Sequence, residues 1–401
     1  MSAPSISPPR HARIAVSVLF CTNGALIASF LPRLPAVKAE LDLSNTALGG
    51  GIAFFPAGAL LATAVSGWLV ARFGSGRLAV AATTAFGLSL PLLGLAPTWA
   101  AFAAVALLYG LCDGTTDVAQ NAHGLRVQRG YGRSIINGFH AWWSIGGVIG
   151  GLAAAGAAAL AIPLTVHLAV AGGVVAMAAL AAGRWTLPGP DPGVNHAAAP
   201  RVPPDLPESG RAGTARARRP ALLALGGIAG LTLLMAVIED VPGTWGAVYL
   251  RDELGTSPGL AGLAFASFTA GMTAGRLVAD RGVDRWGHAS VVRAGAAVTA
   301  IGLGGALLIG SPWIGLAGFA LVGIGAAPSI PASFHAAGHR AGVRPATGVA
   351  VVSWSMRIGF MIAPPVVGAV ADATSLTAGV GLGVLAALGV FAGASFLRER
   401  R

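Results

Sequence analysis

The chain has 401 residues, of which 55% are hydrophobic and only 10% are charged, and its mean hydropathy is +0.73. This composition excludes an ordinary soluble globular domain, because too much apolar area would face water. The formal charge of +11 does not indicate a nucleic-acid binder, since the arginines lie in short polar segments between long apolar runs. We therefore expect an integral protein of the cytoplasmic membrane, whose partners are the lipid bilayer and a small-molecule substrate.

The first apolar run, 14–32, follows a basic N-terminal stretch and is too long for a typical cleaved signal segment, so we interpret it as the first membrane span. About 20 mainly apolar residues are needed to cross the hydrocarbon core. Such runs are found at 14–32, 48–71, 78–97, 99–121, 135–158, 163–183, 221–241, 258–279, 290–310, 313–336, 346–370 and 376–396. The pattern predicts an all-α membrane protein with twelve transmembrane helices.

The segment 184–220 separates the sixth run from the seventh and is rich in proline, glycine and arginine. Such a segment cannot bury a core, so it is predicted to be a flexible cytoplasmic linker between two six-helix bundles, 1–183 and 221–401. Lys/Arg residues favour alternate loops, and the opposite loops hold only Arg33, Lys38 and Arg251. This asymmetry predicts that both termini are cytoplasmic.

Two similar short segments follow the second and the eighth runs, which predicts that the bundles are pseudo-symmetric parallel repeats. The first contains Gly67, Arg72, Gly74 and Arg77, and the second contains Asp284, Arg285 and Gly287. In this respect the chain resembles the major facilitator superfamily (MFS), whose loop between helices 2 and 3 carries a G-x-x-x-D-R-x-G-x-x-R pattern. The resemblance implies secondary transport by two bundles that rock around a midplane site.

In that pattern, an arginine beside a carboxylate can latch two helices at their cytoplasmic ends in one conformation. Here Ala71 replaces the acidic residue, which predicts a weaker latch in the first bundle. The alternative is that these arginines only enforce topology. Three further segments, 117–121, 140–147 and Glu239 with Trp245 and Tyr249, resemble an uncharacterised bacterial subgroup of the YbjJ type. That resemblance supplies no substrate and only a hint of sugars.

Ionisable residues inside spans are costly and need a partner, a water-filled cavity or a function. The third and twelfth runs contain none and the ninth contains only Arg293 near its start, whereas the fourth, seventh and eleventh contain Asp113, Asp117, Glu239, Asp240 and Arg357. In the superfamily fold the third, sixth, ninth and twelfth helices are peripheral, so the pattern agrees with the resemblance. These five residues are our first candidates for substrate or proton binding.

In the fourth run, Asp113, Asp117 and Asn121 follow a four-residue spacing that places them on one helix face, with Gln120 beside them. His140, in the next run, is predicted at a depth similar to that of Asp117. A contact between the two side chains would serve as a proton relay or gate, or equally as a static hydrogen bond that packs two helices.

In the seventh run, Glu239 and Asp240 precede Pro242 and Gly243, which are predicted to break the helix. Adjacent carboxylates with little solvent repel each other, which favours uptake of a proton by one of them, and Glu239 is the preferred candidate. The alternative is a solvated helix end.

Arg357 lies about ten residues into the eleventh run, roughly 15 Å deep, where it would bind an anionic or polyhydroxylated substrate or pair with Asp113. Candidate cavity-lining residues are Asn23, Trp142, Trp143 and Trp354. His167 and His335 are interpreted as single buried hydrogen-bonding residues, and no metal site is predicted.

These patterns favour a monomeric, proton-coupled secondary transporter that needs no cofactor except the proton gradient. Uptake of a sugar-like or polar metabolite is slightly favoured over efflux of a drug or metabolite. No Walker loop is present, so ATP-driven transport is not supported. The alternatives are a non-transporting receptor or scaffold of the same fold, and a membrane-embedded enzyme built on Asp113, Asp117 and His140, although no enzymatic activity is expected.

Overall fold

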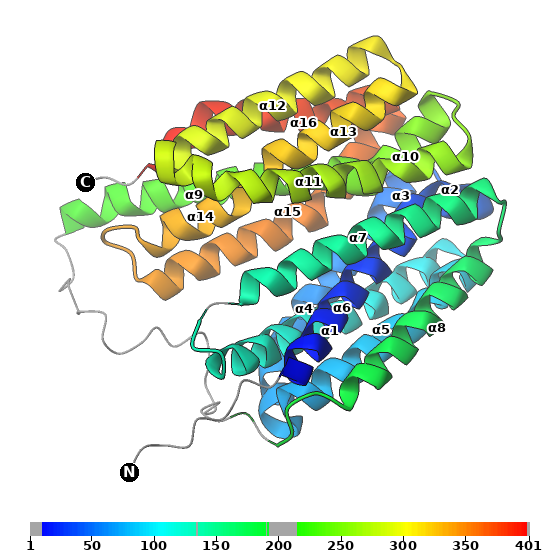
Figure 1. The fold of residues 1–401 in the computed structure, drawn as a ribbon. Helices are drawn as coiled ribbons and strands as arrows, with labels where there is room; N and C mark the ends of the chain where they lie inside the picture. Colours follow the sequence, from blue (N-terminus) through cyan, green and yellow to red (C-terminus); the bar gives the residue numbers. More distant parts are fainter. Residues whose placement is uncertain (1–9, 134, 190, 192–214, 399–401) are drawn as a thin grey trace. The chain divides into compact units, whose positions relative to one another are not determined.

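The computed structural model describes residues 10–133, 135–189, 191 and 215–398, and its regular elements are all helical (Figure 1). Most of the predicted linker, 192–214, lies outside the described residues, as does the N-terminal stretch 1–9. The first eight helices are α1 (Arg10–Phe30), α2 (Leu34–Glu40), α3 (Asn45–Ile52), α4 (Phe54–Phe73), α5 (Ser75–Leu95), α6 (Trp99–Arg129), α7 (Ile136–Ala159) and α8 (Leu164–Gly183). The others are α9 (Ala215–Asp240), α10 (Gly246–Val248), α11 (Pro258–Trp286), α12 (His288–Ile309), α13 (Pro312–Ala326), α14 (Ser329–Gly338), α15 (Pro345–Ala373) and α16 (Leu376–Gly393).

Eleven helical segments among the described residues are long and apolar enough to cross a membrane. Each contains most or all of one predicted run, which confirms a multi-pass helical membrane protein. The eighth predicted run lies in α11, which is a 29-residue helix but is less apolar, because it contains several Gly, Ser and Thr residues besides Arg276. The count of twelve spans and the cytoplasmic termini remain predictions.

The predicted break at Pro242 and Gly243 is wrong. The chain continues from α9 through a π-helical turn, Val241–Trp245, into α10 and a second π-helical turn, Tyr249–Glu253. A proline inside a helix lacks an N–H and collides with the carbonyl one turn before it. A wider turn with i to i+5 hydrogen bonds relieves that collision without ending the helix.

Two compact units are found in the structure. The first comprises residues 1–43, 54–197 and 257–266, and the second comprises 44–53, 198–256 and 267–401. In the first unit α1 packs on α7, α4 on α6 and α5 on α8, while in the second α12 packs on α13 and α16, and α9 packs on α15. The domain boundaries predicted from the sequence, 1–183, 184–220 and 221–401, remain a prediction.

The abundant glycines let helix backbones touch. A Cβ added to Gly24 of α1 would overlap the carbonyl oxygen of Trp143 in α7, and one added to Gly146 would overlap the carbonyl oxygen of Cys21. Small residues at helix crossings allow this close approach in a membrane, where packing replaces the hydrophobic drive between helices. The α1–α7 crossing brings the neighbouring polar residues of both helices together.

Candidate functional site

Three of the predicted site residues meet in the first unit. Asn23 of α1 donates from Nδ2 to Oδ1 of Asp113 in α6, at 3.0 Å, and its Oδ1 accepts from Nε1 of Trp143 in α7, at 2.7 Å. Asn23 is only 3% exposed, so both ends of its amide need these partners. The network fixes one carboxylate and one indole ring on three different helices.

One turn further along α6, Nδ2 of Asn121 donates to Oδ1 of Asp117 at 2.9 Å, and both residues are half-buried. Gln120, next to Asn121 in the helix, is buried, at 1% exposure. The ring of His140 packs edge-on against Phe20, with ring centroids 5.1 Å apart. The predicted contact between His140 and Asp117 remains a prediction.

The second unit holds the paired carboxylates of α9. Asp240 is 7% exposed and accepts a hydrogen bond of 2.7 Å at Oδ1 from Oγ1 of Thr244, which the π-helical turn places one turn later. Its other oxygen, Oδ2, is buried with no hydrogen-bond partner among the described residues. Asp240 is therefore not at a solvated helix end, and the alternative stated above is wrong for this residue.

Arg276 of α11 was missed by the sequence analysis. It lies close enough to Glu239 for their charges to interact, and Glu239 is itself half-buried. The signal was present, because Arg276 lies inside the apolar run 258–279, and the rule that selected Arg357 applies to it equally. The second unit thus holds two carboxylates and a guanidinium inside neighbouring helices.

Arg357 lies on α15 and is half-buried, and Trp354, one turn earlier, is 56% exposed. The spacing of three places both side chains on one face of the helix. Among the described residues of the second unit, no carboxylate forms an ion pair with Arg357. Pairing of Arg357 with Asp113 remains a prediction.

The predicted repeat segments share one backbone conformation. Gly74 ends α4 with φ 84° and ψ 142°, and Gly287 ends α11 with φ 77° and ψ 159°. Positive φ at this point favours glycine. The arginine before each turn lies over the next aromatic ring at 5.6 Å, Arg72 over Phe73 and Arg285 over Trp286. The two segments are therefore alike in local structure as well as in sequence.

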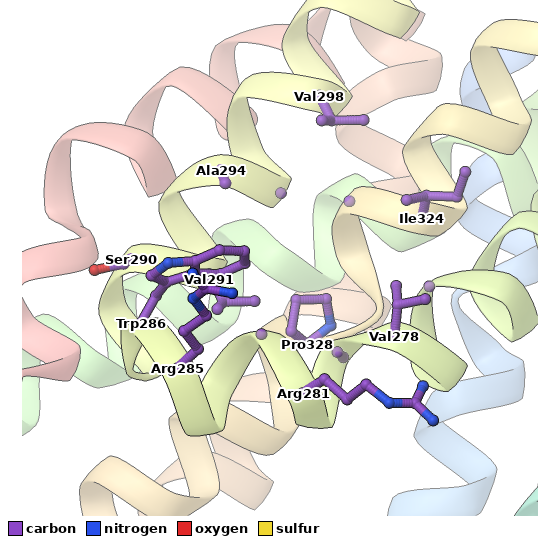
Figure 2. A pocket seen from close by; sticks show the side chains of 15 residues that line it. Val278, Arg281, Arg285, Trp286, Ser290, Val291, Ala294, Val298, Ile324 and Pro328 are labelled. Atoms are coloured by element: carbon purple, nitrogen blue, oxygen red, sulfur yellow. The ribbon is translucent and has the colours of Figure 1, made fainter.

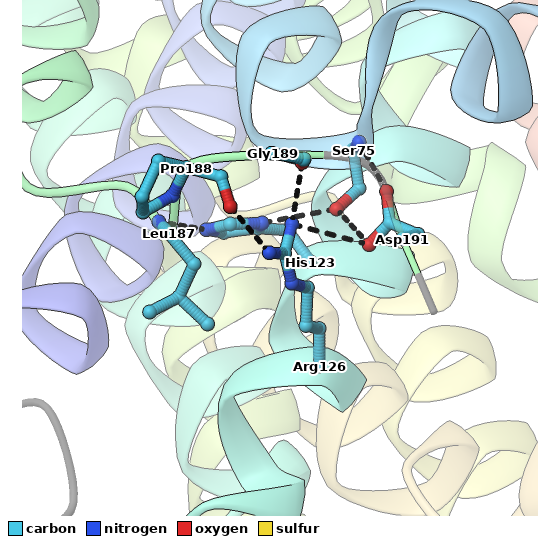
Figure 3. A network of polar contacts seen from close by, with 7 residues as sticks. All are labelled: Ser75, His123, Arg126, Leu187, Pro188, Gly189 and Asp191. Carbon is cyan, nitrogen blue, oxygen red and sulfur yellow. Dashed lines mark hydrogen bonds and ion pairs between the residues drawn. The ribbon is translucent and has the colours of Figure 1, made fainter. Parts of the chain in front are cut away.

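An acidic residue does reach the first repeat segment, from the start of the linker (Figure 3). We call Leu187–Gly189 together with Asp191 the linker strap. The backbone N–H and the hydroxyl of Ser75, the first residue of α5, donate to the Asp191 carboxylate at 2.5 and 2.7 Å. A negative charge is favourable at a helix N-terminus. Asp191 thus places a carboxylate beside the loop in which Ala71 replaces the acid of the superfamily pattern.

Two residues of α6 hold the rest of the linker strap. Arg126 donates to the carbonyl oxygens of Pro188 and Gly189 at 2.6 and 3.0 Å, and it lies 3.6 Å from the Asp191 carboxylate. His123 is fully buried, and its Nε2 accepts from the Leu187 N–H at 3.2 Å. Its Nδ1 is 3.0 Å from the Ser75 hydroxyl, which donates to Asp191, so Nδ1 must carry the proton.

We expect the variant Asp191→Ala to lower the free energy of unfolding by about 1–3 kcal/mol, because two partly buried hydrogen bonds from Ser75 to a charged acceptor are lost. Thermal unfolding of the purified protein in detergent measures this loss. The matched control is Asp280→Ala, which removes an exposed carboxylate of α11. Equal stability of the two variants would contradict a holding role for the linker strap.

The histidine predictions need correction. His167 is 8% exposed, but neither ring nitrogen has a hydrogen-bond partner among the described residues, so the predicted hydrogen bond of this side chain is wrong. His335 is not an isolated residue, because its ring stacks between those of His288 and His339 at 4.2 and 4.4 Å. Distance along the sequence hid this cluster, since His288 begins α12 and the other two lie at the end of α14.

A multi-pass helical protein with carboxylates and arginines inside its spans has the features of the class of secondary transporters. A family model described as Major Facilitator Superfamily matches residues 228–401. An uncharacterised MFS-type transporter of Yersinia pestis is 31% identical, over 97% of this chain and 97% of its own length. An uncharacterised transporter of Sinorhizobium fredii, y4wD, is 30% identical over 90% of this chain and 91% of its own length. The chain belongs to the Major Facilitator Superfamily.

Solved structures show the same fold. The nucleoside transporter NupG matches with a TM-score of 0.72 at 13% identity, covering 97% of this chain and all of that one. A D-xylose-proton symporter matches with a TM-score of 0.67 at 16% identity, covering 95% of this chain and 97% of that one. Identities this low support the fold alone.

Proposed function

We propose that the protein takes up a small polar solute across the cytoplasmic membrane by alternating access, in symport with protons. The observation that carries the proposal is the pair of acids in the seventh run, where the buried Asp240 has one carboxylate oxygen without a partner among the described residues and the half-buried Glu239 interacts with Arg276. A second charged carboxylate beside a buried carboxylate with an unpaired oxygen is costly, so this pair is suited to carry a proton, with Glu239 as the preferred site and Asp240 as the alternative. The proton gradient is the only energy source required, and the transporter acts as a monomer.

The substrate class is proposed from the polar groups of the first unit. Asn23, Asp113 and Trp143 present an amide, a carboxylate and an indole ring that are already held by hydrogen bonds. Such groups recognise hydroxyl-rich rings by hydrogen bonding and stacking. Two of the solved structures that share this fold are a nucleoside transporter and a D-xylose-proton symporter, and the solute proposed for this chain falls in the same polyhydroxylated class.

A ligand screen tests the substrate class. The purified protein is heated with sugars, sugar acids, nucleosides, amino acids and common antibiotics, because a ligand that binds the folded state raises its apparent stability. At 100 times its Kd a ligand stabilises by about 2.7 kcal/mol. We expect a sugar-like compound to raise the unfolding temperature.

The variant Arg357→Ala tests whether Arg357 belongs to the solute-binding site. We expect it to abolish the ligand-induced shift while leaving the unfolding temperature of the free protein unchanged, because no ion pair with the described residues of its own unit holds this arginine. The control is Arg129→Ala, at the exposed end of α6, which should keep the shift. A marked loss of thermal stability with the ligand response retained would show instead that Arg357 is a structural residue.

A further inference from the structure

A groove on the second unit lies apart from the residues proposed to bind the solute or the proton, and it includes Arg285 of the second repeat segment. It has a volume of about 620 Å³ and is lined by α11, α12 and the α13–α14 segment. Its walls are apolar, with small residues at the base and Val278, Val298 and Ile324 along the sides (Figure 2). The side chains of Val278 and Ile324 are 59% and 37% exposed. Because these two walls are partly exposed, the groove opens toward the outside of the protein.

The charges of the groove lie at one end. Arg281, Arg285 and Trp286 come from the last two turns of α11, and Figure 2 shows them at the end opposite to Val298 and Ile324. Arg285 lies over the Trp286 ring at 5.6 Å, and Arg281 donates to the Leu277 carbonyl of its own helix at 3.3 Å. Among the described residues, neither guanidinium forms an ion pair with a carboxylate. Both arginines thus keep donors available for an anion.

The dimensions of the groove match one leaflet of a bilayer. On α12 the lining of the groove runs from Ser290 to Val298, which corresponds to roughly 12 Å along the helix. This length is close to half of a hydrocarbon core of about 30 Å. The arginine end lies where α11 turns into α12, which is the level of lipid headgroups, and tryptophan is enriched at that level. The arginine pattern of the loops assigns this end to the cytoplasmic leaflet, which carries anionic lipids.

We infer that this groove binds one anionic phospholipid, with its headgroup at the end that carries Arg281 and Arg285 and an acyl chain along Val278, Val298 and Ile324. Two guanidinium groups without an ion-pair partner among the described residues favour a headgroup of net negative charge over a zwitterionic one, and each can donate hydrogen bonds to the phosphate group. The apolar walls favour a lipid over free phosphate, because free phosphate has no acyl chain to contact them. This site is separate from the proposed solute site and does not depend on it.

Native mass spectrometry of the full-length protein, titrated with phosphatidylglycerol in detergent, tests the inference. We expect one tight site, with phosphatidylcholine of the same acyl chains binding more weakly. Replacing both arginines, Arg281→Gln with Arg285→Gln, should weaken phosphatidylglycerol binding about 25-fold, since each basic side chain near an anionic lipid contributes about fivefold. The charge-matched control, Arg129→Gln with Arg133→Gln, changes two exposed arginines outside the groove and should bind like the parent protein.

A second variant leaves both arginines in place. Ala294→Phe fills the groove from the exposed side of α12 and should weaken binding about tenfold, the loss for roughly two displaced methylene groups. Unchanged phosphatidylglycerol binding in Ala294→Phe or in the double arginine variant would overturn the inference. Displacement of the lipid by millimolar inorganic phosphate would also overturn it, as would a dimer that Ala294→Phe dissociates, because a second copy would then occupy the groove.

Discussion

Asp113→Ala is expected to lower solute uptake by about 10- to 100-fold while the protein still folds. The carboxylate of Asp113 accepts a hydrogen bond from the side-chain amide of Asn23, and the oxygen of that amide accepts one from the Trp143 ring and so orients it. Removing an acceptor that is charged costs roughly 1.5–3 kcal/mol. Both the hydrogen bond and the orientation of the indole ring are lost, so the variant should lose substrate binding before it loses stability. Uptake into proteoliposomes, with the ligand found in the screen, measures the effect.

The companion variant Asp113→Asn separates hydrogen bonding from charge. An asparagine at this position still accepts from Asn23 through its amide oxygen, so the Trp143 orientation should be kept. Uptake close to that of the parent would show that Asp113 acts by positioning, and a loss as large as that in Asp113→Ala would show that its charge is needed. Parent-like uptake in both variants would contradict any role for this network in transport.

Glu239→Gln is expected to uncouple solute movement from the pH gradient. If one proton accompanies each solute, a gradient of one pH unit supplies about 1.4 kcal/mol and drives about tenfold accumulation. The variant cannot release a proton at this position. It should therefore still exchange solute across the membrane, but the solute concentration inside should not rise above the concentration outside. The measurement is accumulation in sealed vesicles with an imposed pH gradient, together with counterflow without a gradient.

The control for this experiment is Asp280→Asn, an exposed carboxylate on α11 that should keep full accumulation. Asp240→Asn tests the neighbouring acid, and an effect confined to it would move the proton site from Glu239 to Asp240. Accumulation that persists in both acidic variants would refute proton coupling through α9. If the parent protein moves no solute at all and a partner binds the linker, the protein would be a receptor or scaffold and not a transporter.

Many of the candidate residues could be selected from the sequence, because the free-energy cost of an ionisable side chain inside a membrane depends strongly on residue type and depth. Asp113, Glu239, Asp240 and Arg357 were selected by that cost, and the four-residue spacing placed Asp113, Asp117 and Asn121 on one face. The hydrogen bonds of Asn23 could not be predicted, since they join helices 90 and 120 residues apart. Arg276 was missed for a different reason, because the charge rule was not applied to the eighth run.

The sequence by itself determined the helical spans, the glycine turns at Gly74 and Gly287, and the acids and arginines inside the membrane. Each of these depends on local properties, namely the length of an apolar run, the positive φ that glycine allows, and the desolvation of a charge. Only the tertiary structure decided that Pro242 widens a helix instead of ending it, and that Asp191 lies at the N-terminus of α5. Both outcomes depend on how distant segments pack, because a backbone group without its usual hydrogen bond takes whichever partner the fold brings near it.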